Sequence, residues 1–189
     1  MTISLPGFPS GWLKLALSAA ILALGALAIS PLASPVQAQD TAAAEIDPAL
    51  VEQGFKVWKG QDCIGCHGWA GNGERIGENP TGPSLRALEY DAATLKEIIL
   101  CGRPGTAMPS HDPRAYSDDR CYGMTKADLA GVNLLKGRDM SDAEADALVA
   151  YMMESMLGHP NQPSQEDCKA YYGGKPFCSK YPTAESQGF

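Results

Sequence analysis

The 189-residue sequence has few of the residues from which several common sites are built. It contains only three histidines, His67, His111 and His159, and a single C-x-x-C pair, with no H-x-x-x-H run. A structural zinc site normally needs a second ligand pair at similar spacing, so a zinc module is not expected. No constellation of acid, base and nucleophile predicts an enzyme site. Strand-like alternation and internal repeats are absent as well.

Basic residues and long apolar runs are also scarce. The chain has 15 Lys and Arg against 22 Asp and Glu, which argues against nucleic acid or acidic surfaces as partners. Its one long apolar run, from about Leu15 to Leu32, follows a short region whose sole charge is Lys14 and precedes Val36-Gln37-Ala38. These features predict a signal peptide over residues 1–38, and an uncleaved membrane anchor is the alternative.

The length of the chain after signal removal predicts how many domains it forms. Cleavage after Ala38 would leave 151 residues with 14 basic and 22 acidic side chains, a formal charge of −8. A chain of this length forms one domain. We expect a flexible leader at residues 39–46, a folded domain at residues 47–158 and a C-terminal tail at residues 159–189. No other segment is long and apolar enough to cross a bilayer, so the mature part is expected to be soluble.

The most specific motif is the C-x-x-C-H run that begins at Cys63 and ends at His67. Residues three apart share a face of a helix, so the thiols of Cys63 and Cys66 can reach the two vinyl groups of one haem while His67 lies below its iron. The motif predicts one covalently attached haem c, and a chance match or half of a zinc site is the alternative. Covalent haem attachment in bacteria takes place outside the cytoplasm, which agrees with export to the periplasm.

The rest of the pattern is helical. Apolar residues recur at helical spacing in four stretches that each begin at a capping residue. The predicted helices run from Asp47-Pro48 toward Cys63, from Asp91 to the residue before Gly102, from Thr125 to Leu135, and from Ser141 to Gly158. The last of them begins with a capping box. Loops rich in Gly, Pro, Asn and Asp, at residues 71–82 and 104–119, separate the helices.

Together with the loop Gly105-Thr106-Ala107-Met108-Pro109, these elements resemble a class I cytochrome c of the bacterial kind that carries one haem. The Gly and aromatic residue of that family's first helix match Gly54 and Trp58, and the Leu and Tyr of its last helix match Leu148 and Tyr151. The resemblance covers about residues 47–158. It implies an all-α cytochrome c fold in which the N- and C-terminal helices cross and loops enclose the haem. One extra residue between Trp58 and Cys63 departs from the family pattern, so the first helix is expected to end in a bulge.

In that family a methionine in a loop ending Met-Pro binds the iron on the side opposite the histidine. Met108 is the expected ligand, because it alone among seven methionines lies in a Gly-containing loop directly before a proline. A neutral thioether favours ferrous iron and raises the potential, which suits an electron carrier. His111 is the alternative, and ligation by two histidines would lower the potential.

Further roles follow from the same resemblance. The run Gly82-Pro83-Ser84-Leu85 matches the family's Gly-Pro-x-Leu. The carbonyl of Pro83 would then accept the proton on the far nitrogen of His67, and Leu85 would pack on the haem face. Arg75, Arg86 and Arg103 are candidates to pair with the haem propionates, and an ordinary surface position is the alternative for each of them.

Four other cysteines, Cys101, Cys121, Cys168 and Cys178, predict two disulfides in an exported protein, with three connectivities open. We expect neighbours to pair, because Cys101–Cys121 would enclose the loop bearing Met108 and Cys168–Cys178 would enclose a hairpin-like segment of the tail. Each loop closure contributes roughly 3 kcal/mol to stability. Free reactive thiols or a metal pair are the alternatives.

The Met loop, the partner Cys121 and the tail also resemble a branch of bacterial cytochromes with four extra cysteines that is linked with methanol metabolism. Such cytochromes commonly accept electrons from a quinoprotein alcohol dehydrogenase. The resemblance implies a diffusible one-electron carrier rather than an enzyme, monomeric or in transient complexes with a redox donor and an acceptor. The alternatives are a sensor or haem enzyme from which Met108 dissociates, and a fixed haem subunit of a larger dehydrogenase or oxidase.

Overall fold

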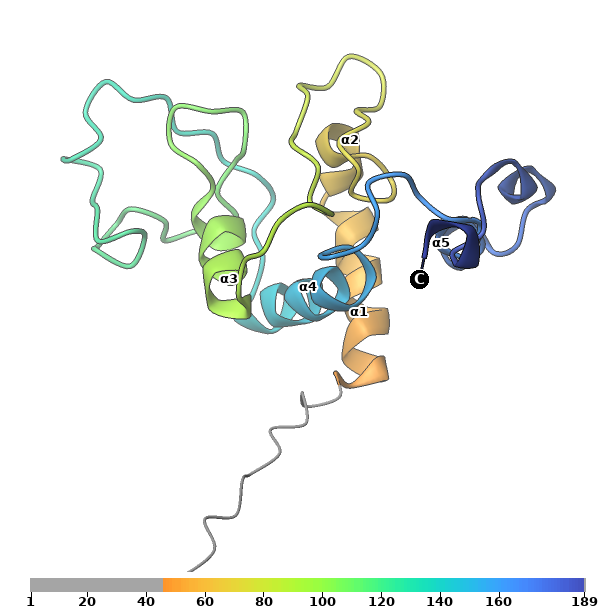
Figure 1. The fold of residues 1–189 in the computed structure, drawn as a ribbon. Helices are drawn as coiled ribbons and strands as arrows, with labels where there is room; N and C mark the ends of the chain where they lie inside the picture. The colour runs from red at the N-terminus through yellow and green to blue at the C-terminus, as the bar shows by residue number, and fades with distance from the viewer. Residues whose placement is uncertain (1–45, 189) are drawn as a thin grey trace, which may run out of the picture. The chain divides into compact units, whose positions relative to one another are not determined.

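The computed structural model describes residues 46–188, so the predicted signal peptide and nearly all of the predicted leader lie outside the described residues. The elements of this part are α1 (Pro48–Gly60), α2 (Cys63–His67), α3 (Ala92–Cys101), α4 (Asp142–Ser155), α5 (Gln165–Tyr172) and the short 3-10 helices η1 (Pro176–Lys180) and η2 (Glu185–Gln187). Figure 1 shows these helices joined by long loops, with no strand among the described residues. The predicted all-α fold is confirmed. None of the helices within residues 46–188 is long and apolar enough to span a membrane.

Helix α1 begins as the sequence predicts. The side chain of Asp47 accepts a hydrogen bond of 2.9 Å from the backbone N–H of Ala49, and Pro48 occupies the first turn, where its missing N–H costs nothing. The helix keeps regular hydrogen bonding up to the N–H of Gln61, which donates to the carbonyl of Val57. No bulge forms. The extra residue before Cys63 is accommodated in a turn in which Asp62 adopts a left-handed conformation with φ of 60°.

Helix α4 crosses α1, and Figure 1 shows the two helices in contact. At the crossing, a Cβ added to Gly54 would lie 1.9 Å from the backbone carbonyl oxygen of Ala147. The glycine is therefore what allows the two backbones to approach this closely. The predicted crossing of the N- and C-terminal helices is confirmed.

The ends of α4 differ in how well they were predicted. Ser141 and Glu144 form the expected capping box. The helix ends at Ser155, before the predicted Gly158, because Met156 leaves the helical conformation and places its side chain in the core, where it is 1% exposed. Gly158 closes the following turn with φ of 76°.

Helix α3 packs against α4 and completes the main core. Asp91 caps it by accepting from the N–H of Thr94 at 2.7 Å, and Gly102 ends it with φ of 65°. The buried side chains of this core come from all three long helices and from the loops between them: Trp58, Leu85, Leu95, Ile99, Met140, Ala145, Leu148, Val149, Met152 and Met156.

The helix predicted from Thr125 to Leu135 is wrong. Asp128 accepts hydrogen bonds from the N–H and the hydroxyl of Thr125, as in a capping box, but only turns follow, and Gly131 has φ of 83°. The end of this segment is held instead by the Met loop, because the carbonyls of Asn133 and Leu135 accept hydrogen bonds from that loop's backbone. Tertiary backbone pairing outweighs the local helix signal here.

The tail contains a helix that the sequence analysis missed. Ser164 and Asp167 form a capping box that begins α5, and the Cys168–Cys178 disulfide joins α5 to η1. The predicted disulfide is present, but the hairpin-like segment it was expected to enclose is a helix followed by a 3-10 turn. The tail packs on the chain around Trp69 and Ala70, directly after the C-x-x-C-H motif.

A glycine-to-alanine change tests the helix crossing. We expect Gly54→Ala to lower the free energy of unfolding by about 3 kcal/mol, because its Cβ meets a backbone carbonyl that cannot rotate away. Gly60→Ala at the end of the same helix is the matched control, since nothing lies within 4 Å of its Cβ, and it should be neutral or slightly stabilising. Urea unfolding measures both variants, and equal stabilities for the two would contradict the crossing.

Candidate haem site

The C-x-x-C-H motif forms the short helix α2. Cys63 and Cys66 are the two cysteines of the described chain that are not in disulfides, and both are partly exposed. Burial raises the pKa of the Cys63 thiol to about 12 and also raises the pKa of Cys66. Both groups therefore keep their protons near neutral pH, unlike the thiolate of a catalytic cysteine. No group of three or more His, Cys, Asp or Glu within residues 46–188 could hold a metal ion, so the zinc alternative lacks a second ligand pair.

His67 has a fixed orientation. Its Nδ1 lies 2.9 Å from the carbonyl oxygen of Pro83. A carbonyl can only accept, so Nδ1 carries the proton and Nε2 keeps its lone pair. Burial lowers the pKa of His67, which favours the neutral imidazole that binds metals. The contact predicted between His67 and Pro83 is thus present, and iron binding by His67 stays a prediction.

Two segments are joined around this contact, which we call the histidine segment (residues 66–71) and the proline segment (residues 82–86). Their hydrogen bonds run from Gly82 N–H to the Cys66 carbonyl at 2.9 Å, from His67 to Pro83, and from Leu85 N–H to the Gly71 carbonyl at 2.7 Å. A Cβ added to Gly82 would lie 2.7 Å from Nδ1 of His67, so the close approach of the two segments requires glycine at this position.

Aromatic and aliphatic side chains lie next to the histidine segment. The indole N–H of Trp58 donates to the carbonyl of Trp69 at 3.2 Å, and the Trp58 ring lies 6.5 Å from the His67 ring between centroids. Leu85 is 7% exposed and belongs to the main core. Its predicted packing on the haem face remains a prediction.

The loop that carries Met108 is folded on itself. The N–H of Met108 donates to the hydroxyl of Thr106, and its carbonyl accepts from the N–H of Arg103, both at 3.1 Å. The Met108 side chain is half-buried. The charge of Arg103 contributes to the lowered pKa of His67, so the start of this loop lies within electrostatic reach of the histidine.

The base of this loop is held by contacts that the sequence analysis missed. The Cys101–Cys121 disulfide is present as predicted. In addition, the hydroxyl of Tyr116 donates to the Cys101 carbonyl at 2.9 Å, and that of Tyr122 donates to the Gly102 carbonyl at 2.8 Å. In the sequence, the only indication that Tyr122 helps to hold the loop was its position next to Cys121.

The alternative iron ligand His111 is in a different environment. It is 5% exposed, its Nδ1 lies 2.8 Å from the carbonyl oxygen of Arg138, and a Cβ on Gly137 would touch its ring. The contact at Nδ1 is of the same kind as that of His67, so it does not by itself decide against His111 as a ligand. The burial of the His111 ring does favour Met108, which is half-buried, and the choice of Met108 stays a prediction.

The three arginines considered for the propionates differ. Arg103 donates to the hydroxyl of Tyr90 at 3.4 Å, and its propionate role stays a prediction. Arg75 donates to the carbonyls of Gly77 and Asn79 within its own loop. Arg86 is 1% exposed, and its guanidinium pairs with the carboxylate of Asp167 in the tail.

The family model for cytochrome c matches residues 51–155, more than half of the chain. The chain belongs to the cytochrome c family. The match includes the C-x-x-C-H motif, the Met108 loop, all but the first three residues of α1 and helices α2 to α4, whereas α5 lies beyond its end. No curated protein and no solved structure matches the chain.

Membership of this family means that the protein binds one haem c covalently and is a haem-based electron carrier. The residues present fit the group. Two protonated thiols three residues apart can each form a thioether, and the neutral His67 keeps its Nε2 lone pair. Members of the family are generally carriers rather than enzymes.

The disulfide at the base of the Met108 loop gives a prediction for this cytochrome. Replacing Cys101 and Cys121 by Ala should lower the free energy of unfolding by roughly 3 kcal/mol and speed amide hydrogen exchange within residues 102–120, because the loop loses its closure. Replacing Cys168 and Cys178 is the matched control, since it should leave exchange in that loop unchanged. Similar exchange profiles for the two double variants would contradict a loop-specific role.

Proposed function

We propose that this cytochrome is an exported, periplasmic one-electron carrier in which Cys63 and Cys66 would hold the haem covalently and His67 and Met108 would bind its iron. The observation that carries the proposal is the hydrogen bond from Nδ1 of His67 to Pro83, because it leaves the lone pair of a neutral imidazole on Nε2, where it can bind iron. The haem, when bound, supplies reversible one-electron chemistry at its iron.

The residues around the site suit transfer without rearrangement. His67 lies in the histidine segment and is held by its hydrogen bond to the proline segment, and the Met108 loop is closed by a disulfide and by two tyrosine hydroxyls. Side chains held in this way would keep their positions when a bound haem gains or loses an electron, so they would hold the group with little reorganisation. The thioether of Met108 favours the ferrous state and gives a carrier of raised potential.

Export is supported by two features of the chain. The first 38 residues have the pattern of a signal peptide, although they lie outside the described residues. The four cysteines outside the haem motif form two disulfides, which are stable in an oxidising compartment. We propose the periplasm as that compartment.

The proposed donor is a quinoprotein alcohol dehydrogenase. The support is the resemblance of the Met108 loop, its partner Cys121 and the disulfide-containing tail to cytochromes linked with methanol metabolism. The formal charge of −8 after signal removal is compatible with docking on a basic patch of such a partner.

The axial ligand can be tested by substitution. In Met108→Ala we expect the weak far-red sulfur-to-iron band of the ferric protein to disappear and carbon monoxide to bind the ferrous protein. We also expect the reduction equilibrium constant to fall at least tenfold, which lowers the midpoint potential by at least about 59 mV for one electron. Met124→Ala is the control, because Met124 is also half-buried but packs against the Cys101–Cys121 disulfide. Loss of the native spectrum in His111→Ala instead of Met108→Ala would overturn the assignment, and rapid carbon monoxide binding by the wild type would favour a sensor or enzyme.

The donor can be tested by stopped-flow mixing. A quinoprotein alcohol dehydrogenase reduced by its alcohol should reduce the ferric cytochrome with a rate that saturates as the cytochrome concentration rises, which indicates a complex. An unrelated class I cytochrome of similar potential serves as the control. Equal rates for the two cytochromes would contradict this donor while leaving the carrier function intact.

A further inference from the structure

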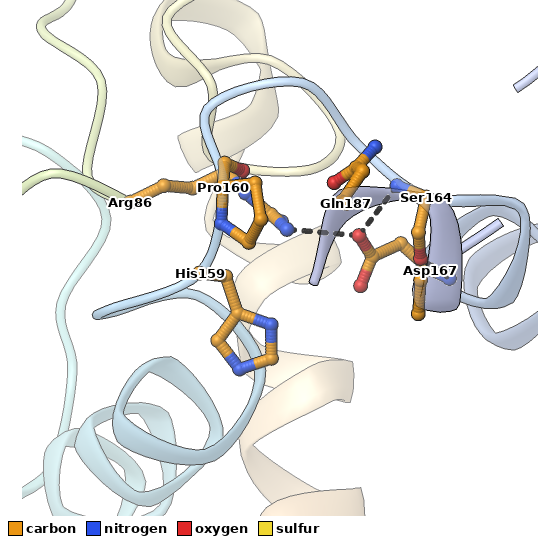
Figure 2. Close-up of a pocket in the computed structure, with 7 residues that line it drawn as sticks. Arg86, His159, Pro160, Ser164, Asp167 and Gln187 are labelled. Atoms are coloured by element: carbon orange, nitrogen blue, oxygen red, sulfur yellow. Dashed lines mark hydrogen bonds and ion pairs between the residues drawn. The ribbon is translucent and has the colours of Figure 1, made fainter. Parts of the chain in front are cut away.

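Arg86 is a buried charge at the end of the proline segment. Its side chain is 1% exposed, and its guanidinium donates to the Ala70 carbonyl at 3.1 Å, to the Asp167 carboxylate at 2.8 Å and to the Pro160 carbonyl. Figure 2 shows Arg86 reaching past Pro160 to Asp167, which lies on α5. One side chain thus joins the two segments of the haem site to the tail.

The hydrogen bond from Arg86 to the Ala70 carbonyl is a further link between the proline segment and the histidine segment. Three hydrogen bonds already connect the histidine and proline segments, and Arg86 adds a fourth from its side chain. The backbone of Arg86 is fixed as well, because its carbonyl accepts from Gly158 N–H at 3.0 Å and its N–H donates to the hydroxyl of Ser84 at 3.3 Å. The proline segment therefore cannot shift along the histidine segment without breaking the contacts of Arg86.

Asp167 fixes the other end of this arrangement. Its carboxylate accepts from Arg86 and also from Ser164 N–H at 2.8 Å, so the same group pairs with the arginine and caps α5. The Cys168–Cys178 disulfide begins at the next residue. A cavity of about 20 Å³, room for a single water, is lined by Arg86, Asp167 and Gln187 among others.

The burial of Arg86 is not explained by the stability that it adds to the attachment of the tail. A buried ion pair gives little net stability compared with apolar packing of the same volume, whereas its directional bonds define one geometry. The tail already has apolar contacts, because Trp69 packs against Tyr171, Tyr172 and Tyr181. The distinct contribution of Arg86 is therefore to position the backbone that it contacts.

We propose that Arg86, held by Asp167 of the tail, is a positioning residue for the axial histidine: it fixes the register of the two segments and so maintains the hydrogen bond from His67 to Pro83. This inference rests on the proposed function, since it assumes that His67 binds the iron. The hydrogen bond makes the imidazole a stronger electron donor to the metal. Weakening it disfavours the ferric state and raises the midpoint potential.

The decisive variant is Arg86→Lys, which keeps the positive charge but cannot make three divergent hydrogen bonds. We expect exchange of the Nδ1 proton of His67, followed by NMR in the ferrous protein, to speed by on the order of tenfold, and the reduction equilibrium constant to rise several-fold. Arg120→Lys is the matched control. Arg120 pairs with Asp118 and Asp112, away from both segments, so its replacement should change neither quantity.

A second variant keeps the inference testable if Arg86→Lys does not fold. Asp167→Asn retains the arginine and an oxygen able to cap α5, but removes the anion that orients the guanidinium. Asp167→Asn should also speed exchange of the Nδ1 proton of His67 and raise the reduction equilibrium constant. The control is Asp146→Asn, which removes the ion pair with Lys96 at 2.7 Å and should change neither the exchange rate nor the equilibrium constant.

The outcomes separate the two proposals. Folded Arg86→Lys, or Asp167→Asn in its place, with wild-type proton exchange and potential would overturn the inference, even if its thermal stability fell. A wild-type protein whose haem lacks His67 as a ligand would instead contradict the proposed function.

Discussion

The hydrogen bond between His67 and the Pro83 carbonyl is the interaction on which the rest of the site depends. It fixes the tautomer and direction of the imidazole, and it exists only because two chain segments approach closely at Gly82. That approach is maintained by backbone pairing near the bond and by the buried Arg86 at the far end of the proline segment. The helix crossing at Gly54 fixes α1, and one short turn joins α1 to the haem motif.

Features encoded by neighbouring residues could be predicted from the sequence. The caps at Asp47, Asp91 and Ser141 each depend on a side chain reaching two or three residues along the chain, and all three are present. The C-x-x-C-H motif and the Gly-Pro-x-Leu run likewise carry their chemistry in a fixed local order. Both disulfides join nearest neighbours, as expected for short loops in an exported protein.

Features that depend on distant residues could not be predicted. The Thr125–Asp128 pair has the form of a helix start, but the following residues pair with the Met108 loop and form turns. Arg86 gave no signal of burial, because its partner Asp167 lies 81 residues away. Helix α5 was missed although Ser164 and Asp167 have capping-box spacing, since it is short and its Tyr171 and Tyr172 pack on Trp69, which lies about 100 residues earlier in the chain.

The most direct test of the account is an optical redox titration of the purified cytochrome with its haem attached. The central claim is that His67 and Met108 stay bound while the iron gains and loses one electron. We expect a single one-electron Nernst curve that is identical in the oxidative and reductive directions, with a low-spin, six-coordinate haem in both states. Hysteresis between the two directions, or a five-coordinate ferrous haem, would contradict it.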